Sequence, residues 1–306
     1  MRVAITGASG FIGTHLVTAL GARGHTAVPV KREAAGELVS PHEGERAEAL
    51  VHLAFPTDAG ARRADPVATL QAVVRGAAKA VAIAEQLGAS HLVLASTGKV
   101  FGSPDRLPIA DDDHAQPTTQ LGLLKRLAEE IFACAARRSE VGVTSLRIFN
   151  AYGPGQTGAF LIPAITDGIA RGELNLGELD HARDWIHVTD VAHAFTSALE
   201  VPAPRAHVRT WNVGSGEAHS ARQILALLRS AGAAVPAPRV DPQKLRAREA
   251  VEERARCDGL RALGWLPRMP LDQGLSELLG SSRLPARVSP PVGRAFDGSP
   301  AVTPGR

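Results

Sequence analysis

Apolar residues along this chain follow two alternating periodicities. Uninterrupted apolar runs predict buried strands, and they lie at residues 2–6, 26–30, 49–55, 91–97 and 143–150. Between these runs, apolar residues recur at helical spacing, most clearly at 11–24, 65–87 and 120–138. Strands that alternate with helices predict right-handed crossovers and a parallel sheet covered on both faces. We therefore expect an α/β fold, a Rossmann-type doubly wound parallel sheet that binds ligands beyond the carboxyl ends of its strands.

Two stretches interrupt this regular alternation. After Lys31 and Arg32, the residues to about Glu48 are polar and poorly periodic. We expect a third strand and its helix to be shortened there, and the pattern does not place them. From Ala151 the pattern loosens into loops and short helices. We expect a main domain at 1–150 with later segments interleaved, a smaller C-terminal substrate-binding portion at 151–279, and a disordered tail at 280–306, which is rich in proline, glycine, serine and arginine.

Composition excludes several classes of protein. The chain has 306 residues, 44% of them hydrophobic, enough for a full core. Cys134 and Cys257 share no metal or redox spacing, which fits a reducing compartment, and neither a signal peptide nor a membrane span is expected. The net charge of +3 comes largely from the tail, and only 4% of residues are aromatic, so no nucleic-acid partner is indicated. A cytoplasmic protein without a bound metal is the expectation.

The segment TGASGFIG provides the first candidate site. Gly7, Gly10 and Gly13 follow a predicted strand and open a predicted helix. In such a turn the first glycine allows the tight bend, the second lets the backbone approach a pyrophosphate, and the third lets helix and strand pack closely. The sequence therefore predicts a dinucleotide site, with Ser9, Phe11 and Ile12 in the same turn.

The end of the second predicted strand indicates which dinucleotide binds. A carboxylate there would accept hydrogen bonds from the ribose hydroxyls of NAD. This chain instead has Lys31 and Arg32, whose positive charge suits the 2′-phosphate of NADP. NADPH is the predicted cofactor, although two basic residues can also simply begin a surface loop.

From residue 1 to about 279 the chain resembles the extended short-chain dehydrogenases/reductases, the NAD(P)-dependent epimerase/dehydratase group. The motifs that carry the resemblance follow the glycine turn in order: HLA at 52–54, STGKVFG at 96–102, RIFNAYGPGQ at 147–156, RDWIHVTDVAHA at 183–194, WNVGSGE at 211–217 and LGWLP at 263–267. The resemblance implies that Leu53 and Ala54 lie beside the cofactor, that Thr97 binds the reacting oxygen, and that Lys125 binds the nicotinamide ribose.

The chain departs from this family at the proton carrier. The family has a tyrosine four residues before the lysine, on the same helix face, and Leu121 stands there. Val73 replaces a supporting asparagine. The sequence has one tyrosine, Tyr152, in a separate loop. Two members of the usual proton relay are therefore missing.

Other residues each allow two interpretations. Ser96, Lys99, Leu121, Asn150 and Tyr152 are candidates for the substrate pocket. For Lys99 an exposed loop lysine is the favoured interpretation, and for Tyr152 packing within its turn is favoured. Further along the chain, we interpret His187 as a structural histidine. The family resemblance leaves open whether Arg183 binds the pyrophosphate of a nucleotide sugar.

The missing acid favours reduction over oxidation. Oxidising an alcohol needs a base, whereas reducing a ketone needs only a proton from water, a hydroxyl or the substrate. The leading hypothesis is an NADPH-dependent ketoreductase acting on a polycyclic aromatic polyketide-like natural product, as in antibiotic biosynthesis. The alternatives are a nucleotide-sugar epimerase or dehydratase with its base moved to Lys99 or Tyr152, and a non-catalytic NADP-binding regulator. The family resemblance also implies a possible homodimer.

Overall fold

A six-stranded parallel sheet forms the centre of the protein. The computed structural model describes residues 1–33, 37–42, 44–56, 59–138, 141–202, 206–245 and 250–281. The strands stand in the order β2-β1-β3-β4-β5-β9, and every neighbouring pair is parallel. Their bounds are β1 Arg2–Thr6, β2 Thr26–Val30, β3 Ala49–His52, β4 His91–Thr97, β5 Gly142–Ile148 and β9 Val208–Val213. The Rossmann-type α/β fold predicted from the apolar pattern is confirmed.

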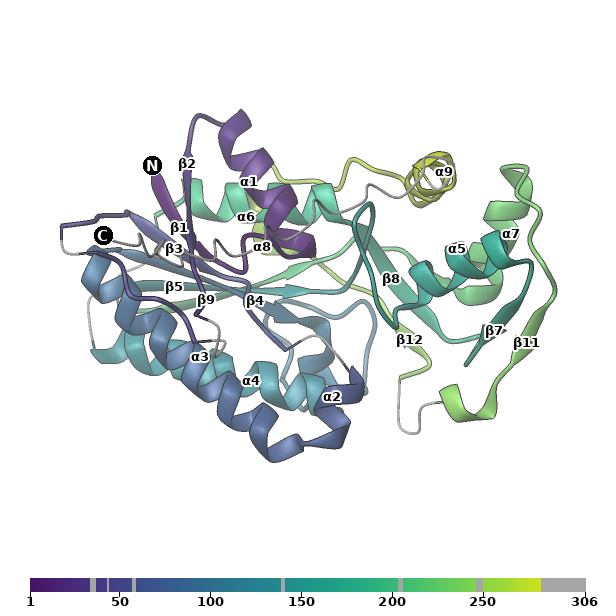
Figure 1. Cartoon of the computed structure of the whole chain (residues 1–306), viewed down its shortest axis with the longest axis horizontal. Coiled ribbons are helices and arrows are strands. Elements are labelled where there is room, and N and C mark those ends of the chain that lie inside the picture. Colours follow the sequence, from purple (N-terminus) through teal and green to yellow (C-terminus); the bar gives the residue numbers. More distant parts are fainter. Residues whose placement is uncertain are drawn as a thin grey trace, which may run out of the picture.

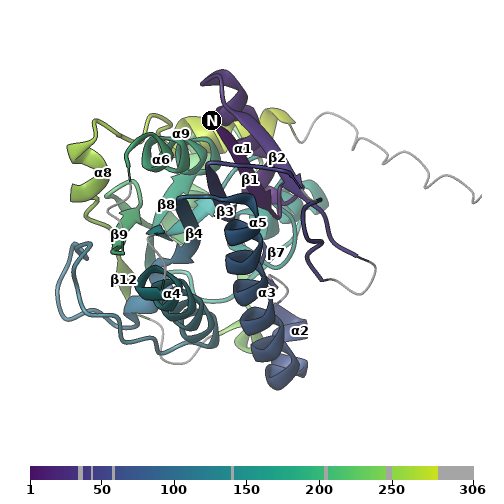
Figure 2. The same ribbon diagram turned by 90° about the vertical axis from the view of Figure 1, so that its left-hand side faces the viewer.

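Helices cover both faces of this sheet. On one face lie α1 (Phe11–Ala22), α6 (Val188–Glu200) and α8 (Asp258–Ala262), and on the other lie α3 (Pro66–Leu87) and α4 (Gln120–Arg138), as Figures 1 and 2 show. Two cores of buried side chains correspond to these faces, one with Leu16 and Phe195, the other with Ile83 and Phe132. The short helix α2 (Ala59–Ala64) leads into α3.

The chain reverses its direction of travel across the sheet between β1 and β3. From β1 it moves outward to β2 and then returns to β3 on the opposite side. The described part of residues 31–48 contains no further outer strand. It contains one isolated antiparallel bridge, between Arg32 and Leu38. Ligands of such sheets bind at this reversal, beyond the carboxyl ends of the strands.

A second unit lies beyond that edge of the sheet (Figure 1). It contains a small sheet of β6 (Asn150–Tyr152), β8 (Ala182–His187), β10 (Ala218–Ser220) and β12 (Glu252–Glu253), and the pair β7 (Leu174–Leu176) and β11 (Pro238–Val240). Helices α5 (Leu161–Arg171), α7 (Ala221–Ser230) and α9 (Leu271–Ser281) pack around a third core that includes Ile162 and Ile224. Because α6, α8 and β9 return to the first unit, residues beyond 150 contribute to both. The predicted tail falls outside the described residues from 282 onward.

Helix α3 carries an unusual exposed apolar surface. Val67, Leu70 and Val74 are 65%, 41% and 38% exposed, and Leu123 on the adjacent α4 is 57% exposed. Among the described residues, α3 alone is long and apolar enough to cross a membrane. Its other side packs into the core through Val73, Ala77 and Ile83, which is the arrangement of a core helix.

Candidate cofactor and substrate site

The glycine turn has the form that a dinucleotide requires. Gly7 has a φ of +76°, and a Cβ there would lie 2.9 Å from the backbone nitrogen of Ala54. A Cβ on Gly13 would lie 2.7 Å from the carbonyl carbon of Ala8 and closer still to the Gly7 oxygen. Gly10 begins α1 with no side chain bonded to the first N–H groups of the helix. The turn therefore leaves these N–H groups open to an anion, and the residues fit a pyrophosphate.

The predicted neighbours of the cofactor lie at this turn. Ser9 is exposed, and Phe11 and Ile12 are half-buried in the first turn of α1. Across the strand reversal, the backbone N–H groups of Leu53 and Ala54 donate to the carbonyl and the hydroxyl of Thr6, at 3.1 and 3.3 Å.

A buried histidine fixes the junction of β1 and β3. His52 Nδ1 lies 2.8 Å from Thr6 Oγ1. Burial lowers the pKa of His52 to about 3, with nearby Lys125 and Arg32 acting in the same direction, so the ring is neutral. A neutral histidine here holds the two strand ends without adding charge beside the turn.

The two basic residues predicted to read the 2′-phosphate follow β2. Lys31 and Arg32 are both exposed. The carbonyl of Lys31 accepts a hydrogen bond from Val39 at 2.9 Å, and Arg32 bridges to Leu38. The backbone of this segment is therefore held in a short ribbon beside the nucleotide turn.

Thr97 ends β4, and its hydroxyl caps the turn that follows. Its hydroxyl oxygen accepts the backbone N–H of Lys99 at 3.3 Å, so it caps the short 3-10 helix η1 (Gly98–Phe101). Its side chain is half-buried. Because the hydroxyl accepts from Lys99, its own proton remains available for a carbonyl oxygen.

Lys125 points into the interior of the protein. Its Nζ donates to the Ala95 carbonyl at 2.6 Å and lies 4.1 Å from the ring centroid of Phe55. Burial lowers the pKa of Lys125 to about 7; Glu129 opposes this shift and Arg62 adds to it. In its charged form Lys125 has three N–H donors, and the Ala95 carbonyl uses one of them, so donors remain for a ribose hydroxyl.

Leu121 lies in the first turn of α4, beside the Thr97 segment. The next residue, Gly122, approaches η1 so closely that a Cβ there would lie 2.8 Å from the carbonyl carbon of Lys99. Leu121 itself is half-buried. The structure thus brings Leu121, Lys125 and Thr97 to neighbouring elements, and the position of the missing tyrosine is apolar.

Ser96 is not brought to the substrate side. Its side chain is buried and its hydroxyl donates to Glu129 at 2.6 Å. Glu129 also accepts two hydrogen bonds from Arg147 and one from Ser145. Successive side chains of a strand point to opposite faces. Ser96 therefore faces α4, where it contacts Glu129, and Thr97 lies at the carboxyl end of β4.

Lys99 is bound to a carboxylate of the second unit. Its Nζ donates to both oxygens of Glu253 on β12, at 2.8 and 2.9 Å. Arg183 on β8 lies 3.7 Å from the same carboxylate and donates to the carbonyl of Ala182 at 2.8 Å. The lysine is therefore neither an exposed loop residue nor a group turned freely toward a substrate.

Tyr152 is packed in the core of the second unit. It is fully buried, its ring meets that of His187 edge to face at 5.3 Å, and its hydroxyl has no hydrogen-bond partner. A Cβ on Gly274 would meet this ring, so α9 closes over it. Asn150 is half-buried, and its amide donates to the Asp184 carbonyl at 3.2 Å. Tyr152 is therefore a packed core residue, and the amide of Asn150 is bonded to the backbone of β8.

Several residues of the site cannot be recognised from a local sequence motif. Phe55 over Lys125 and Glu253 beneath Lys99 belong to no motif, because each acts through a residue far away in sequence. Asp184 and Asp190 lie in the RDWIHVTD motif, and both accept backbone N–H groups from distant loops, at Ser215 and Gly216, and at Arg268 and Met269. These buried aspartates hold the loops of the second unit in place. The described residues contain no cluster of metal-binding side chains.

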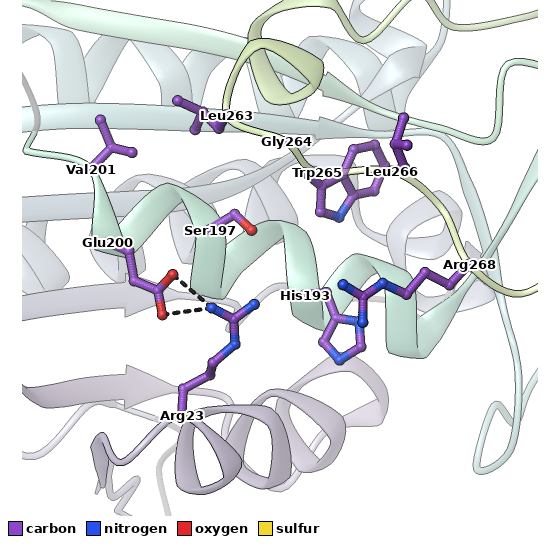
Figure 3. A pocket seen from close by; sticks show the side chains of 10 residues that line it. All are labelled: Arg23, His193, Ser197, Glu200, Val201, Leu263, Gly264, Trp265, Leu266 and Arg268. Atoms are coloured by element: carbon purple, nitrogen blue, oxygen red, sulfur yellow. Dashed lines mark hydrogen bonds and ion pairs between the residues drawn. The ribbon is translucent and has the colours of Figure 1, made fainter.

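A separate pocket lies away from these residues. Figure 3 shows it between the end of α1, helix α6 and residues 263–268, with a volume of about 160 Å³. Arg23, which follows α1, is held there by two hydrogen bonds to Glu200, at 2.8 and 3.0 Å. Because Gly10 and Arg23 flank opposite ends of the 12-residue helix α1, this pocket is not the nucleotide site.

Comparison with known proteins gives relatives along nearly the whole chain. The GDP-6-deoxy-D-mannose reductase of Pseudomonas aeruginosa is 29% identical over 299 residues, covering 91% of this chain and 96% of the relative. The UDP-glucose 4-epimerase of Mycolicibacterium smegmatis is 26% identical over 310 residues, covering 90% and 97%.

Solved structures agree with these relatives. RMD from Pseudomonas aeruginosa, complexed with NADPH, has a TM-score of 0.81 and 27% identity, covering 92% of this chain and 99% of that one. MoeE5 in complex with UDP-glucuronic acid and NAD has a TM-score of 0.80 and 26% identity, covering 92% and 100%. The model of the NAD dependent epimerase/dehydratase family matches residues 3–214. The chain therefore belongs to the NAD dependent epimerase/dehydratase family.

Proposed function

We propose that this protein is an NADPH-dependent ketoreductase that reduces a carbonyl of a polycyclic aromatic polyketide-like natural product. The observation that carries the proposal is the pairing of Thr97, with its hydroxyl proton free to donate, and Leu121, which places an apolar side chain where a proton donor is expected. Such a site can hold a carbonyl oxygen without a resident strong acid or base.

The cofactor side supports reduction with NADPH. The open N-terminus of α1 at Gly10 suits the pyrophosphate, and Lys31 and Arg32 provide positive charge beyond β2. When bound, the reduced nicotinamide supplies the hydride. The protein's contribution is to orient the carbonyl through Thr97 and the cofactor ribose through Lys125, and this alignment lowers the barrier to hydride transfer. The proton that completes the alcohol comes from the substrate or from solvent.

The absence of a protein acid raises the barrier little when the substrate supplies the proton. A positioned acid contributes about 10²–10⁴ in rate, or roughly 3–5 kcal/mol of barrier. A carbonyl that is hydrogen-bonded to a neighbouring phenol carries its own acid and avoids this loss. The chain resembles the ketoreductases of the simocyclinone-type angucyclinone pathway that lack the tyrosine. The proposed substrate class rests on this resemblance.

Charges near Thr97 also favour a substrate without a diphosphate. Lys99 and Arg183 both lie within 4 Å of Glu253, and Arg183 also donates to backbone carbonyls of Ala182 and Val251. A diphosphate would have to compete with the buried Glu253 carboxylate for these cations.

The test is a matched pair of substitutions assayed with NADPH and a panel of polyketide quinones, aromatic ketones and nucleotide sugars. Leu121→Phe introduces the ring of the absent tyrosine without its hydroxyl, and we expect it to retain much of the wild-type activity. Gly10→Asp should abolish activity, because the carboxylate would oppose the pyrophosphate at the start of α1. Total loss in Thr97→Ala would show that its hydroxyl does more than position the substrate. No NADPH consumption with any ketone would refute the proposal.

A second candidate function is the epimerisation or dehydration of a nucleotide sugar. It is favoured by the named relatives, which are a GDP-6-deoxy-D-mannose reductase and a UDP-glucose 4-epimerase. An epimerase returns its cofactor to the starting redox state in each turnover and must hold it tightly. One NADPH consumed per product molecule would exclude epimerisation. A product formed only from nucleotide sugars would transfer the reductase assignment to that substrate class.

A further inference from the structure

An ion pair links the turn after β4, which contains Thr97 and Lys99, to the second unit of the protein. Lys99, in η1, and Glu253, in β12, are 154 residues apart, and the ammonium donates to both carboxylate oxygens at 2.8 and 2.9 Å. The lysine side chain is 16% exposed and the glutamate side chain 6% exposed. A pair so well covered is much less screened by solvent than a surface ion pair.

Glu253 is itself held from the other side. It stands directly opposite Arg183 in the parallel pairing of β12 with β8, and their side chains approach to 3.7 Å. Arg183 in turn donates to the carbonyls of Ala182 and Val251 at 2.8 and 3.4 Å. The carboxylate that receives Lys99 is therefore fixed by the small sheet of the second unit.

At its other end, Lys99 acts on the hydroxyl of Thr97. The backbone N–H of Lys99 donates to Thr97 Oγ1 at 3.3 Å. The backbone of Lys99 is confined further by the first turn of α4, where only glycine fits at 122. One residue thus carries both the anchor to Glu253 and the hydrogen bond that orients the Thr97 hydroxyl.

We propose that the Lys99–Glu253 ion pair positions Thr97, so that the second unit sets the direction of the hydroxyl that meets the carbonyl oxygen. This inference rests on the proposed function, because it takes Thr97 as the group that binds the reacting oxygen. Lys99 is a positioning residue: its ammonium contacts Glu253, and its effect reaches the substrate through Thr97.

The kinetic test uses four variants. Lys99→Met should lower kcat on the order of 10- to 100-fold, the scale of a small misplacement of a reacting group, and leave the KM for NADPH unchanged. Lys99→Arg, which can keep both hydrogen bonds to Glu253, should restore most of kcat. The double variant Lys99→Met with Glu253→Gln removes both charges, avoids an unpaired buried carboxylate, and should be no slower than Lys99→Met. Glu200→Gln breaks the matched pair of Arg23 and Glu200 in the separate pocket (Figure 3) and should leave kcat unchanged.

A readout independent of turnover separates this inference from the proposed function. Hydrogen exchange of the peptide 96–102 should be faster in Lys99→Met and in Glu253→Gln than in wild type, and unchanged in Glu200→Gln. If wild type reduces no carbonyl compound, the proposed function fails, and faster exchange in both variants still supports the positioning link. A Lys99→Met kcat within twofold of an active wild type, or unchanged exchange in both variants, would overturn the link.

Discussion

Gly13→Ala tests whether the first turn of α1 is shaped by backbone contact. The added Cβ would lie 2.7 Å from the carbonyl carbon of Ala8 and closer to the Gly7 oxygen. Carbon atoms in ordinary contact are about 3.5 Å apart, so the Ala8 contact alone requires α1 to move away by roughly 0.8 Å, and the closer Gly7 oxygen requires more. Both neighbours are backbone atoms, which cannot rotate away. Overpacking of this kind costs about 1–3 kcal/mol of the free energy of unfolding.

The same displacement should weaken nucleotide binding. Moving the N–H groups at the start of α1 by this distance should cost at least one hydrogen bond to a charged phosphate, about 1.5–3 kcal/mol, which corresponds to roughly 10- to 100-fold in Kd. Isothermal titration with NADPH and thermal unfolding without it measure the two effects separately.

The same helix contains the control. Gly21 is exposed, and a Cβ there meets nothing within 4 Å. Gly21→Ala should therefore stabilise the protein by about 0.5–1 kcal/mol, since alanine favours a helix more than glycine does, and should leave the Kd unchanged. If Gly13→Ala binds NADPH within twofold of wild type and melts at the same temperature, the reasoning about the turn is wrong.

Three further predictions concern residues around the site. Tyr152→Phe should leave kcat unchanged and should leave the free energy of unfolding unchanged or higher, because the Tyr152 hydroxyl is buried without a partner. A large loss of kcat would instead identify Tyr152 as a relocated acid or base. Burial lowers the pKa of Lys125 from 10.5 to about 7, so between these pH values the unfolded chain binds a proton that the native state lacks. The free energy of unfolding without nucleotide should then gain up to about 1.4 kcal/mol per pH unit from this group, and Lys125→Met should remove that contribution in urea titrations. We also propose that the exposed apolar face of α3 and α4 joins two copies of the chain; Val74→Glu should then shift a dimer to a monomer in analytical ultracentrifugation, and a monomeric wild type would contradict this.

The main sheet could be predicted from the sequence because its information is local. Each buried strand is an uninterrupted apolar run, and each crossover helix repeats apolar residues with its own period. Gly7, Gly10 and Gly13 were similarly informative, since their spacing has a backbone reason that does not depend on the rest of the fold. The weak pattern at 31–48 predicted shortened elements, and the described part of this segment contains a bridge between Arg32 and Leu38 and no strand or helix.

The environment of the site could not be predicted in the same way. The charge of Lys99 is visible in the sequence, but its partner Glu253 lies in a two-residue strand with no apolar period. Ser96 and Thr97 are chemically similar neighbours, and only the strand's register decides that Ser96 turns inward to Glu129. Such pairings depend on how distant elements meet, which a single sequence does not encode locally.

The source of the proton is tested most directly by comparing Leu121→Phe with Leu121→Tyr, which differ by one hydroxyl. With saturating NADPH and a ketone that wild type reduces, we expect kcat values within about tenfold of each other, because the proton comes from the substrate or solvent rather than from this position. A Leu121→Tyr variant faster than Leu121→Phe by the roughly 10²–10⁴ typical of a positioned acid would show that a resident proton donor limits the reaction, and would refute a proton from substrate or solvent.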